Sequence, residues 1–257
     1  MIDLHCHILH GLDDGPTTME DSINMARAAV DNGIHTIVAS PHHQNGRYNT
    51  DRKEILEKVE ELNNVLKEKA IPLTILPGQE VRLYGELIQD YEFNRIVSIN
   101  DGRRYLLCEL PSSRIPKFTE RLFYEMQENR ILPIIVHPER NKVLINEPDI
   151  LFEFVQKGIL TQLTASSITG KFGKKIQKYA FKCIESNWVH IVASDAHNTK
   201  NRNFELNEAY EIIREKFGIE TEFQMRENAQ TILNGDVLYP EEPLKFKQNI
   251  FSRLLGI

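Results

Sequence analysis

Histidine and aspartate side chains that could bind a metal ion gather at the start of the chain, in the stretch "IDLHCHILHGLDDG" that follows Met1. His5 and His7 stand two residues apart at the end of a short apolar run, and a strand directs alternate side chains to the same face. Two exposed histidines can share a face by chance. The stretch therefore indicates metal chemistry only if other parts of the chain bring similar side chains to the same place.

The rest of the chain alternates short apolar runs with longer segments of helical periodicity. In one such segment Met19, Ile23, Ala26 and Val30 recur at spacings of three and four, and Gly33 follows as a stop signal. The apolar runs predict seven strands, over residues 2–5, 35–40, 73–78, 105–110, 132–137, 160–165 and 189–194. Further helices are predicted over residues 51–69, 116–129, 148–157, 173–187 and 205–217.

Strands that alternate with helices predict parallel βαβ units, in which helices cover both faces of the sheet. No glycine-rich phosphate loop follows the first strand, which disfavours an open dinucleotide-binding sheet. No linker, repeat or low-complexity tract divides the chain. We therefore predict an α/β fold with a single domain over residues 1–257, built as a (β/α)7 barrel. The C-terminal ends of its strands would converge on one site.

Imidazole or carboxylate groups stand at the ends of six of the seven predicted strands. Any one of them alone is more often an ordinary surface or hydrogen-bonded residue. In a barrel they would crowd together, and carboxylates without a counter-charge would raise one another's pKa, so bound cations are the better explanation. The nine candidate ligands are His5, His7, Asp14, His42, Glu80, Glu109, His137, Asp195 and His197. This set has no thiolate and exceeds the needs of one ion, which favours two or three ions of Mn²⁺, Fe, Zn²⁺ or Mg²⁺.

Composition and charge disfavour several other classes of protein. The net charge of −6 and the pI near 5.9 argue against binding to nucleic acid through bulk electrostatics. No stretch approaches the roughly 18 apolar residues of a membrane span, and no basic region followed by an apolar one marks a signal peptide. Three cysteines, odd in number and far apart, predict a reduced, cytoplasmic chain without disulfides.

The motifs "HCH", "DDG", "SPHH", "GQE", "CEL", "HPER" and "SDAH" follow one another in an order that resembles the polymerase-and-histidinol-phosphatase (PHP) superfamily. More narrowly, the chain is similar to the bacterial tyrosine-protein phosphatases of the CpsB/CapC family, which are encoded with capsule and exopolysaccharide genes. The similarity extends to about residue 235, which leaves residues 236–257 as a variable C-terminal tail. It implies a distorted PHP barrel with a trinuclear site, in which Asp14 rather than Asp13 is a ligand and Mn²⁺ is the expected metal.

The resemblance also implies an activity and a partner. A metal-activated hydroxide would hydrolyse phosphotyrosine, and the substrate would be an autophosphorylating bacterial tyrosine kinase that controls capsule or exopolysaccharide synthesis. Arg140 and Arg202 would hold phosphate oxygens. His43, beside a ligand, is a candidate general acid or a donor behind the ligands, although a histidine merely exposed at the rim explains it equally well. We expect a homo-oligomer with at most peripheral membrane contact.

Three other functions stay open at this point. A histidinol-phosphate phosphatase, or another PHP phosphoesterase, would share the metal site and differ in substrate. The segment "CELPSSR", from Cys108 to Arg114, fits the C-x5-R spacing of cysteine-based tyrosine phosphatases, but the loop has no glycine and Pro111 removes a backbone donor. A non-catalytic binding protein with a degenerate site is disfavoured by the full set of ligands.

The end of the chain, "PLKFKQNIFSRLLGI", has basic but no acidic side chains after Glu242. Phe246, Ile250, Leu254 and Ile257 would share one helical face, which suits docking to a membrane surface or to a kinase. We favour the alternative that this tail packs on its own domain or on a sister subunit.

Overall fold

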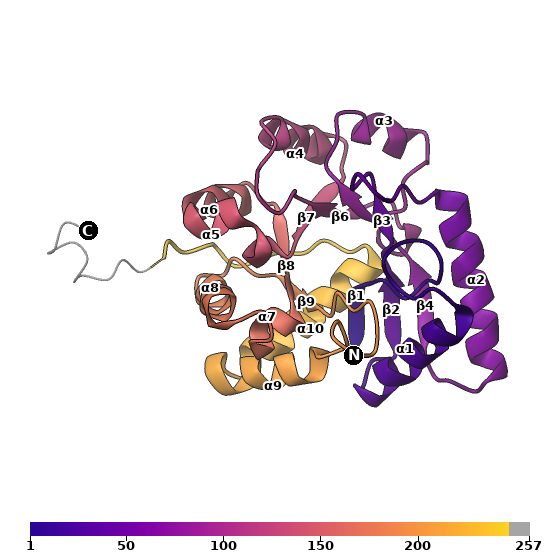
Figure 1. Cartoon of the computed structure of the whole chain (residues 1–257). Coiled ribbons are helices and arrows are strands. Elements are labelled where there is room, and N and C mark those ends of the chain that lie inside the picture. The colour runs from indigo at the N-terminus through magenta and orange to yellow at the C-terminus, as the bar shows by residue number, and fades with distance from the viewer. Residues whose placement is uncertain (247–257) are drawn as a thin grey trace, which may run out of the picture.

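The computed structural model describes residues 1–246, with the strands at its centre and the helices around them (Figure 1). The strands are β1 (Ile2–Cys6), β2 (Thr36–Ala39), β3 (His42–His43), β4 (Thr74–Pro77), β5 (Glu80–Arg82), β6 (Tyr105–Glu109), β7 (Leu132–Val136), β8 (Leu160–Thr164) and β9 (Ile191–Ala193). They form a three-stranded sheet of order β1-β2-β4 and a six-stranded sheet of order β3-β5-β6-β7-β8-β9. Every pairing is parallel, as the alternation of strands and helices predicts.

Two short strands that the sequence did not predict, β3 and β5, follow closely after β2 and β4, so the described residues form nine strands in two sheets. Pro41, which has no N–H to donate, separates β2 from β3, and Gly78 separates β4 from β5. A Cβ added at Gly78 would lie 2.4 Å from the Cγ1 atom of Val38, so only glycine permits this close approach. The N–H of Glu80 still donates to the carbonyl of Pro41 at 3.1 Å, and the two segments therefore stay together across the break.

The two sheets meet just beyond the C-terminal ends of β1, in the smaller sheet, and β9, in the larger sheet. The N–H of Asp195 donates to the carbonyl of His5 at 2.9 Å, and the N–H of His7 donates to the carbonyl of Ala196, also at 2.9 Å. Cys6 forms an isolated parallel bridge with Ala196 between them. Residues from opposite ends of the sequence thereby lie at one edge.

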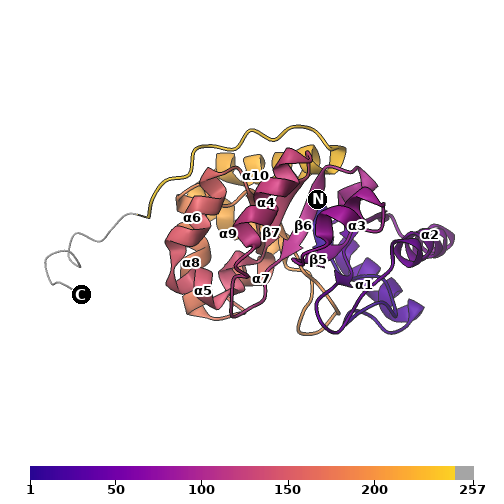
Figure 2. The same cartoon turned by 90° about the horizontal axis from the view of Figure 1, so that it is seen from above.

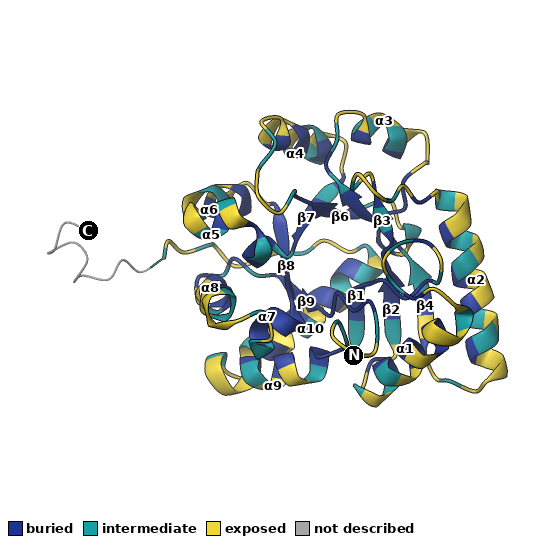
Figure 3. Cartoon of the chain, in the orientation of Figure 1, coloured by how far each residue is buried: buried dark blue, intermediate teal, exposed yellow. Residues whose placement is uncertain are grey.

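The helices are α1 (Met19–Asp31), α2 (Arg52–Glu68), α3 (Leu87–Glu92), α4 (Thr119–Glu128), α5 (Lys142–Asn146), α6 (Pro148–Gln156), α7 (Ala165–Thr169), α8 (Lys174–Glu185), α9 (Leu206–Phe217) and α10 (Ile219–Asn234). The longer ones bury one stripe and expose the other, whereas most strand residues are buried (Figure 3). Helical periodicity does not predict α3, α5 or α7, which have only five or six residues. It also misses α10, because Glu222 and Asn228 are among the buried residues of that helix and obscure its apolar stripe.

After α10 the chain runs as an extended segment along the outside of the molecule (Figure 2). The carbonyl of Leu244 accepts from Trp188 Nε1 at 2.8 Å, and the N–H of Leu244 donates to the carbonyl of Ser186 at 2.8 Å. The ring of Phe246 stacks on Trp188 with centroids 3.9 Å apart. As far as Phe246, the tail therefore packs on its own domain; Ile250, Leu254 and Ile257 lie outside the described residues. Over residues 1–246, no helix has both the length and the apolar content needed to cross a membrane.

Candidate metal centre

The structure brings all nine candidate ligands together in one region, from strands of both sheets and from the loops that follow them. Seven of them form three overlapping groups, in each of which one ligand atom per residue lies within 4.8 Å of the others: His7, Asp14, His42 and His197; His5, His7 and Glu80; and His42, Glu80 and Glu109. His137 and Asp195 contact these groups. His137 Nε2 lies 2.7 Å from Glu80 Oε1, and Asp195 Oδ1 lies 3.6 Å from His5 Nε2.

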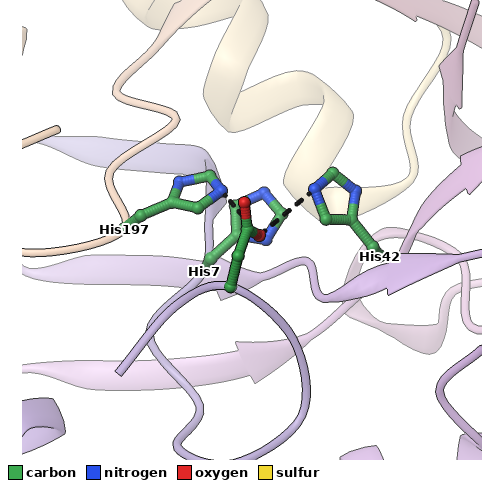
Figure 4. Close-up of side chains that lie close together, drawn as sticks. His7, His42 and His197 are labelled. Atoms are coloured by element: carbon green, nitrogen blue, oxygen red, sulfur yellow. Dashed lines mark ion pairs between the residues drawn. The ribbon is translucent and has the colours of Figure 1, made fainter. Parts of the chain in front are cut away.

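Imidazoles from three distant parts of the chain surround one carboxylate in the first group (Figure 4). Asp14 Oδ1 lies 3.4 Å from His42 Nε2 and 3.2 Å from His197 Nε2. The ring of His7 stacks on that of His197 with centroids 3.7 Å apart. A loop after β1, the short strand β3 and the loop after β9 thus supply nitrogen and oxygen atoms to a single point.

Glu80 belongs to two of the three groups and is fully buried in the site. Its Oε1 atom contacts His137, and its Oε2 atom lies 2.7 Å from His42 Nδ1 and 3.4 Å from His7 Nε2. Burial alone would raise the pKa of this carboxyl, but His42 and His5 hold the pKa of Glu80 well below its usual value. Glu80 is therefore a carboxylate with Oε1 facing His137 and Oε2 facing His7 and His42, an arrangement that suits a bridging ligand.

Neighbouring groups fix which imidazole nitrogen faces the site. Asp13 Oδ2 lies 2.5 Å from His7 Nδ1, and Gln162 Oε1 lies 2.8 Å from His5 Nδ1. The carbonyl of Asp195 lies 2.9 Å from His197 Nδ1 in the same way. Each of these acceptors places the proton on Nδ1 and leaves Nε2 free to bind a cation, which is how metal-binding histidines are usually held. Sequence reasoning missed Asp13 and Gln162 in this role.

Both missed residues carried a usable signal. Asp13 precedes the chosen ligand Asp14 in "DDG", and its carboxylate also accepts from the N–H of His42 at 3.0 Å. Gln162 occupies the middle of β8, the strand from which sequence reasoning assigned no ligand. A polar residue inside an otherwise buried strand indicates that its side chain has a specific partner.

Three buried atoms within residues 1–246 test whether the site fits a metal. His42 Nδ1, Glu80 Oε2 and His197 Nε2 have no partner in hydrogen-bonding geometry. His42 Nδ1 and Glu80 Oε2 lie 2.7 Å apart, yet they do not meet the geometry of a hydrogen bond. Buried polar atoms seldom lack partners, and cations would satisfy all three. The nitrogen and oxygen donor set also suits divalent ions, so these residues fit a metal centre.

Two of the candidate ligands stand in strained backbone conformations. His137 has φ of +37° and Asp195 has φ of +53°, values that residues other than glycine rarely adopt. Such strain costs roughly 1–3 kcal/mol per residue and persists where the surrounding structure enforces it, often at functional sites. His137 directly follows β7, and Asp195 stands two residues after the end of β9.

The ligands open onto a cavity of about 540 Å³ that both predicted phosphate-binding arginines line. Arg140 contacts Asp195 Oδ2, and Arg202 Nη2 donates to both oxygens of Asp195 at 3.0 Å. Although burial favours the neutral acid, His7, Arg140 and Arg202 hold the pKa of Asp195 well below its usual value. The cavity therefore presents two guanidinium groups beside the metal ligands, which suits an anion such as a phosphate ester.

His43 lies away from this cavity, and its placement does not support the predicted role as an acid. Its ring contacts the carbonyl of Thr50, 3.1 Å from Nδ1, and packs edge-on against Tyr84. It lines a separate hollow beside the start of α2. The reason is the alternation within β3, which turns His43 away from the side on which His42 meets the ligands.

The cysteine-based alternative is contradicted by the position of Cys108. This residue is fully buried in β6, and burial raises the pKa of its thiol. Arg114, the other residue of the C-x5-R spacing, is exposed to solvent. A nucleophilic cysteine needs an accessible thiolate, which this environment prevents.

Proteins similar in sequence to this chain are named as phosphatases, which agrees with an anion site beside candidate metal ligands. A family model described as "Capsular polysaccharide synthesis, CpsB/CapC" matches residues 1–234. The chain is 43% identical over 247 residues to the tyrosine-protein phosphatase YwqE of Bacillus subtilis (strain 168), covering 95% of this chain and 97% of that protein. It is 38% identical over 256 residues to the putative tyrosine-protein phosphatase CapC of Staphylococcus aureus, with 99% and 100% covered. Identity to the tyrosine-protein phosphatase CpsB of Streptococcus agalactiae is 31% over 241 residues, with 91% and 99% covered.

Solved structures agree with these relatives. A crystal structure from work on YwqE from Bacillus subtilis and CpsB from Streptococcus pneumoniae, described as unique metal-dependent tyrosine phosphatases, matches with a TM-score of 0.93 at 43% identity. The match covers 96% of this chain and 100% of that one. Organophosphorus hydrolase from Deinococcus radiodurans matches with a TM-score of 0.53 at 15% identity, over 90% of this chain and 91% of that one, which is a likeness of fold alone.

Proposed function

Since this chain belongs to the CpsB/CapC family of capsular polysaccharide synthesis, we propose that it is a metal-dependent protein-tyrosine phosphatase of capsule or exopolysaccharide synthesis. The observation that carries the proposal is the convergence of three overlapping ligand groups and two arginines on one cavity. The proposed substrate is phosphotyrosine on an autophosphorylating bacterial tyrosine kinase of the same system. The proposed location is the cytoplasm, where the three buried, unpaired cysteines would stay reduced.

The nine predicted ligands are the residues we propose for two or three cations, with Mn²⁺ as the expected ion. His7, Asp14, His42 and His197 would hold one ion, and the two groups that share Glu80 would hold the others. His137 and Asp195 would complete these sets. When bound, such cations act as Lewis acids toward phosphoryl oxygens and lower the pKa of water, which is the chemistry that hydrolysis of a phosphate ester needs.

The chain's own residues bind and orient the ester. Arg140 and Arg202 would hold the phosphoryl oxygens through several N–H donors and offset the charge that develops on them. The leaving tyrosyl oxygen belongs to a phenol with a pKa of about 10, so it needs protonation less than a serine alkoxide does. The proposal therefore gives no role to His43, which lies outside the cavity.

A further part of the proposal concerns the fold: the two sheets would form one distorted seven-stranded PHP barrel, interrupted at Pro41 and Gly78. One buried apolar cluster supports this, because it joins Leu4 of the smaller sheet to Leu107 and Ile134 of the larger one. We also propose that residues 1–257 form one domain and that the protein is a homo-oligomer.

The test compares purified enzyme as prepared, stripped with a chelator, and restored with Mn²⁺, using p-nitrophenyl phosphate and a phosphotyrosine peptide. We expect hydrolysis to be lost on stripping and regained with Mn²⁺, since the ligands cannot act without a cation. Arg114→Ala and Cys108→Ser should leave it unchanged, because neither side chain reaches the cavity. Hydrolysis that survives stripping would refute the metal mechanism, and a higher kcat/KM for histidinol phosphate than for the peptide would replace the proposed substrate.

A further inference from the structure

The cavity beside the metal ligands has apolar side chains at one boundary, and we propose that these bind the phenyl ring of an aryl phosphate substrate. They are Leu110, Phe172 and Ile176, which line the same cavity as Arg140 and which we call the aryl wall. This inference rests on the proposed function, because it specifies how that site would favour a tyrosyl phosphate. Leu110 is buried, whereas Phe172 and Ile176 are half-exposed within the cavity.

Contact between Phe172 and Arg140 places the aryl wall next to the expected phosphate position. The guanidinium carbon of Arg140 lies 5.2 Å from the centre of the Phe172 ring. Arg140 also contacts the candidate ligand Asp195, so this guanidinium connects the metal site with Phe172, and a phosphate bound by it would have Phe172 nearby. The organic group of the ester then extends from the phosphate toward the aryl wall. A phenyl ring there would remove apolar surface from water and could pack against an aromatic edge.

The segment that carries Phe172 is held in place by its own contacts. Gly170 and Gly173 have φ of +89° and +94°, and the N–H of Gly173 donates to the carbonyl of Gly170 at 2.9 Å, which closes a turn around Phe172. Lys171 forms an ion pair with the buried carboxylate of Glu205. Since residues other than glycine rarely adopt these backbone angles, the sequence itself fixes the turn. The aryl wall is therefore formed before any substrate binds.

The aryl wall can contribute only to substrates that carry a group of sufficient size beyond the phosphate. A phenyl group bonded through the ester oxygen would meet Phe172 and Ile176, whereas a methyl group would leave both side chains in contact with water. The arginines and the metal ligands contact the phosphoryl group in either case. The wall should therefore change the ratio of affinities for aryl and alkyl ligands, while the affinity for the phosphoryl group itself stays the same.

The experiment measures dissociation constants of phenylphosphonate and methylphosphonate by calorimetry on the full chain loaded with Mn²⁺. We expect the wild type to bind phenylphosphonate about tenfold more tightly, a factor consistent with one aromatic contact plus the apolar area it buries. Phe172→Ala and Ile176→Ala should each reduce this ratio roughly two- to fivefold and leave the methylphosphonate constant unchanged. Phe181→Ala removes an aromatic ring outside the cavity from α8, the helix that carries Ile176; it is the matched control and should keep the ratio.

Two results would overturn the aryl wall. One is a ratio that stays at its wild-type value in both variants. The other is a loss of methylphosphonate binding that equals the loss of phenylphosphonate binding, which would mean that Phe172 acts only by positioning Arg140. Steady-state assays separate this inference from the proposed function: if phosphotyrosine peptide is not hydrolysed but the phenyl-to-methyl ratio behaves as expected, the function fails and the wall stands. In an active enzyme, Ile176→Ala should raise KM for the peptide with little change in kcat.

Discussion

Replacing Asp13 by asparagine tests whether the residues behind the ligands control metal binding. The Asp13 carboxylate accepts three hydrogen bonds, from His7 Nδ1 at 2.5 Å, from the N–H of His42 at 3.0 Å and from the N–H of Gly15 at 2.9 Å. An asparagine of the same shape has only one oxygen, so its NH₂ group must face at least one of these donors. The exchange also removes the negative charge that fixes the Nδ1–H tautomer of His7.

The expected cost follows from those contacts. A hydrogen bond to a charged group contributes about 1.5–3 kcal/mol, which corresponds to a factor of roughly 10–150 in an equilibrium constant. Loss of an outer partner of a metal-binding histidine typically weakens metal affinity by about 10–100-fold, which lies in the same range. We therefore expect Asp13→Asn to weaken Mn²⁺ binding about 10–100-fold while the number of bound ions at saturation stays the same.

The assay is competition for Mn²⁺ against a chelator of known affinity, with stoichiometry from elemental analysis. Asp21→Asn is the matched control, because it removes the same charge from the exposed capping box at the start of α1. Its Mn²⁺ affinity should equal that of the wild type. Affinity within about twofold of wild type in Asp13→Asn would refute the reasoning, since the contact would then not orient His7. Loss of a whole ion would instead make Asp13 a direct ligand.

Two further predictions concern stability. Gly78→Ala should lower the free energy of unfolding, measured in urea, by about 1–3 kcal/mol, because the new Cβ would overlap the buried side chain of Val38. Gly85 has open space around it, so the control Gly85→Ala should stay within about 0.5 kcal/mol of the wild type. Equal effects of the two substitutions would contradict the close approach at Gly78. Burial lowers the pKa of His190 to about 4 in the folded protein, so as the pH falls the unfolded chain binds a proton at this residue first. The contribution of neutral His190 to the free energy of unfolding is therefore complete above pH 6.5. It is lost as the pH falls toward 4, which lowers the free energy of unfolding by about 3 kcal/mol. His190→Asn, measured by unfolding at several pH values, should remove that part of the acid sensitivity, and an unchanged pH profile would contradict it.

The sequence predicted most of the secondary structure because its patterns were strong. The helix predicted over residues 51–69 is α2, and the strand predicted over 105–110 is β6. The short strands β3 and β5 were missed because two or three residues carry too little local pattern, and their pairing depends on strands elsewhere in the chain. Likewise, the sequence listed which residue types could bind metal, but could not say that Gln162 would face His5.

Candidate metal ligands were easier to select from the sequence than the residues around them, for a physical reason. Metal ligands need particular atoms, so residue type and position after a strand identify candidates such as His137 and Asp195. A residue such as His43 has the right atoms, and only the direction of its side chain in β3 distinguishes it from His42. The aryl wall has no chemical signature at all, since Phe172 and Ile176 look like ordinary apolar residues until the fold places them beside Arg140.

The extended segment after α10 has an evolutionary consequence, because the protein holds it through main-chain groups. Arg104 Nη1 donates to the carbonyl of Gly235 at 2.8 Å, Trp188 Nε1 donates to the carbonyl of Leu244, and the N–H of Leu238 donates to the hydroxyl of Tyr105 at 3.2 Å. Every amino acid supplies a carbonyl, and all but proline supply an N–H. Most substitutions in this segment would therefore keep these three hydrogen bonds, whereas the stacking of Phe246 on Trp188 requires an aromatic side chain.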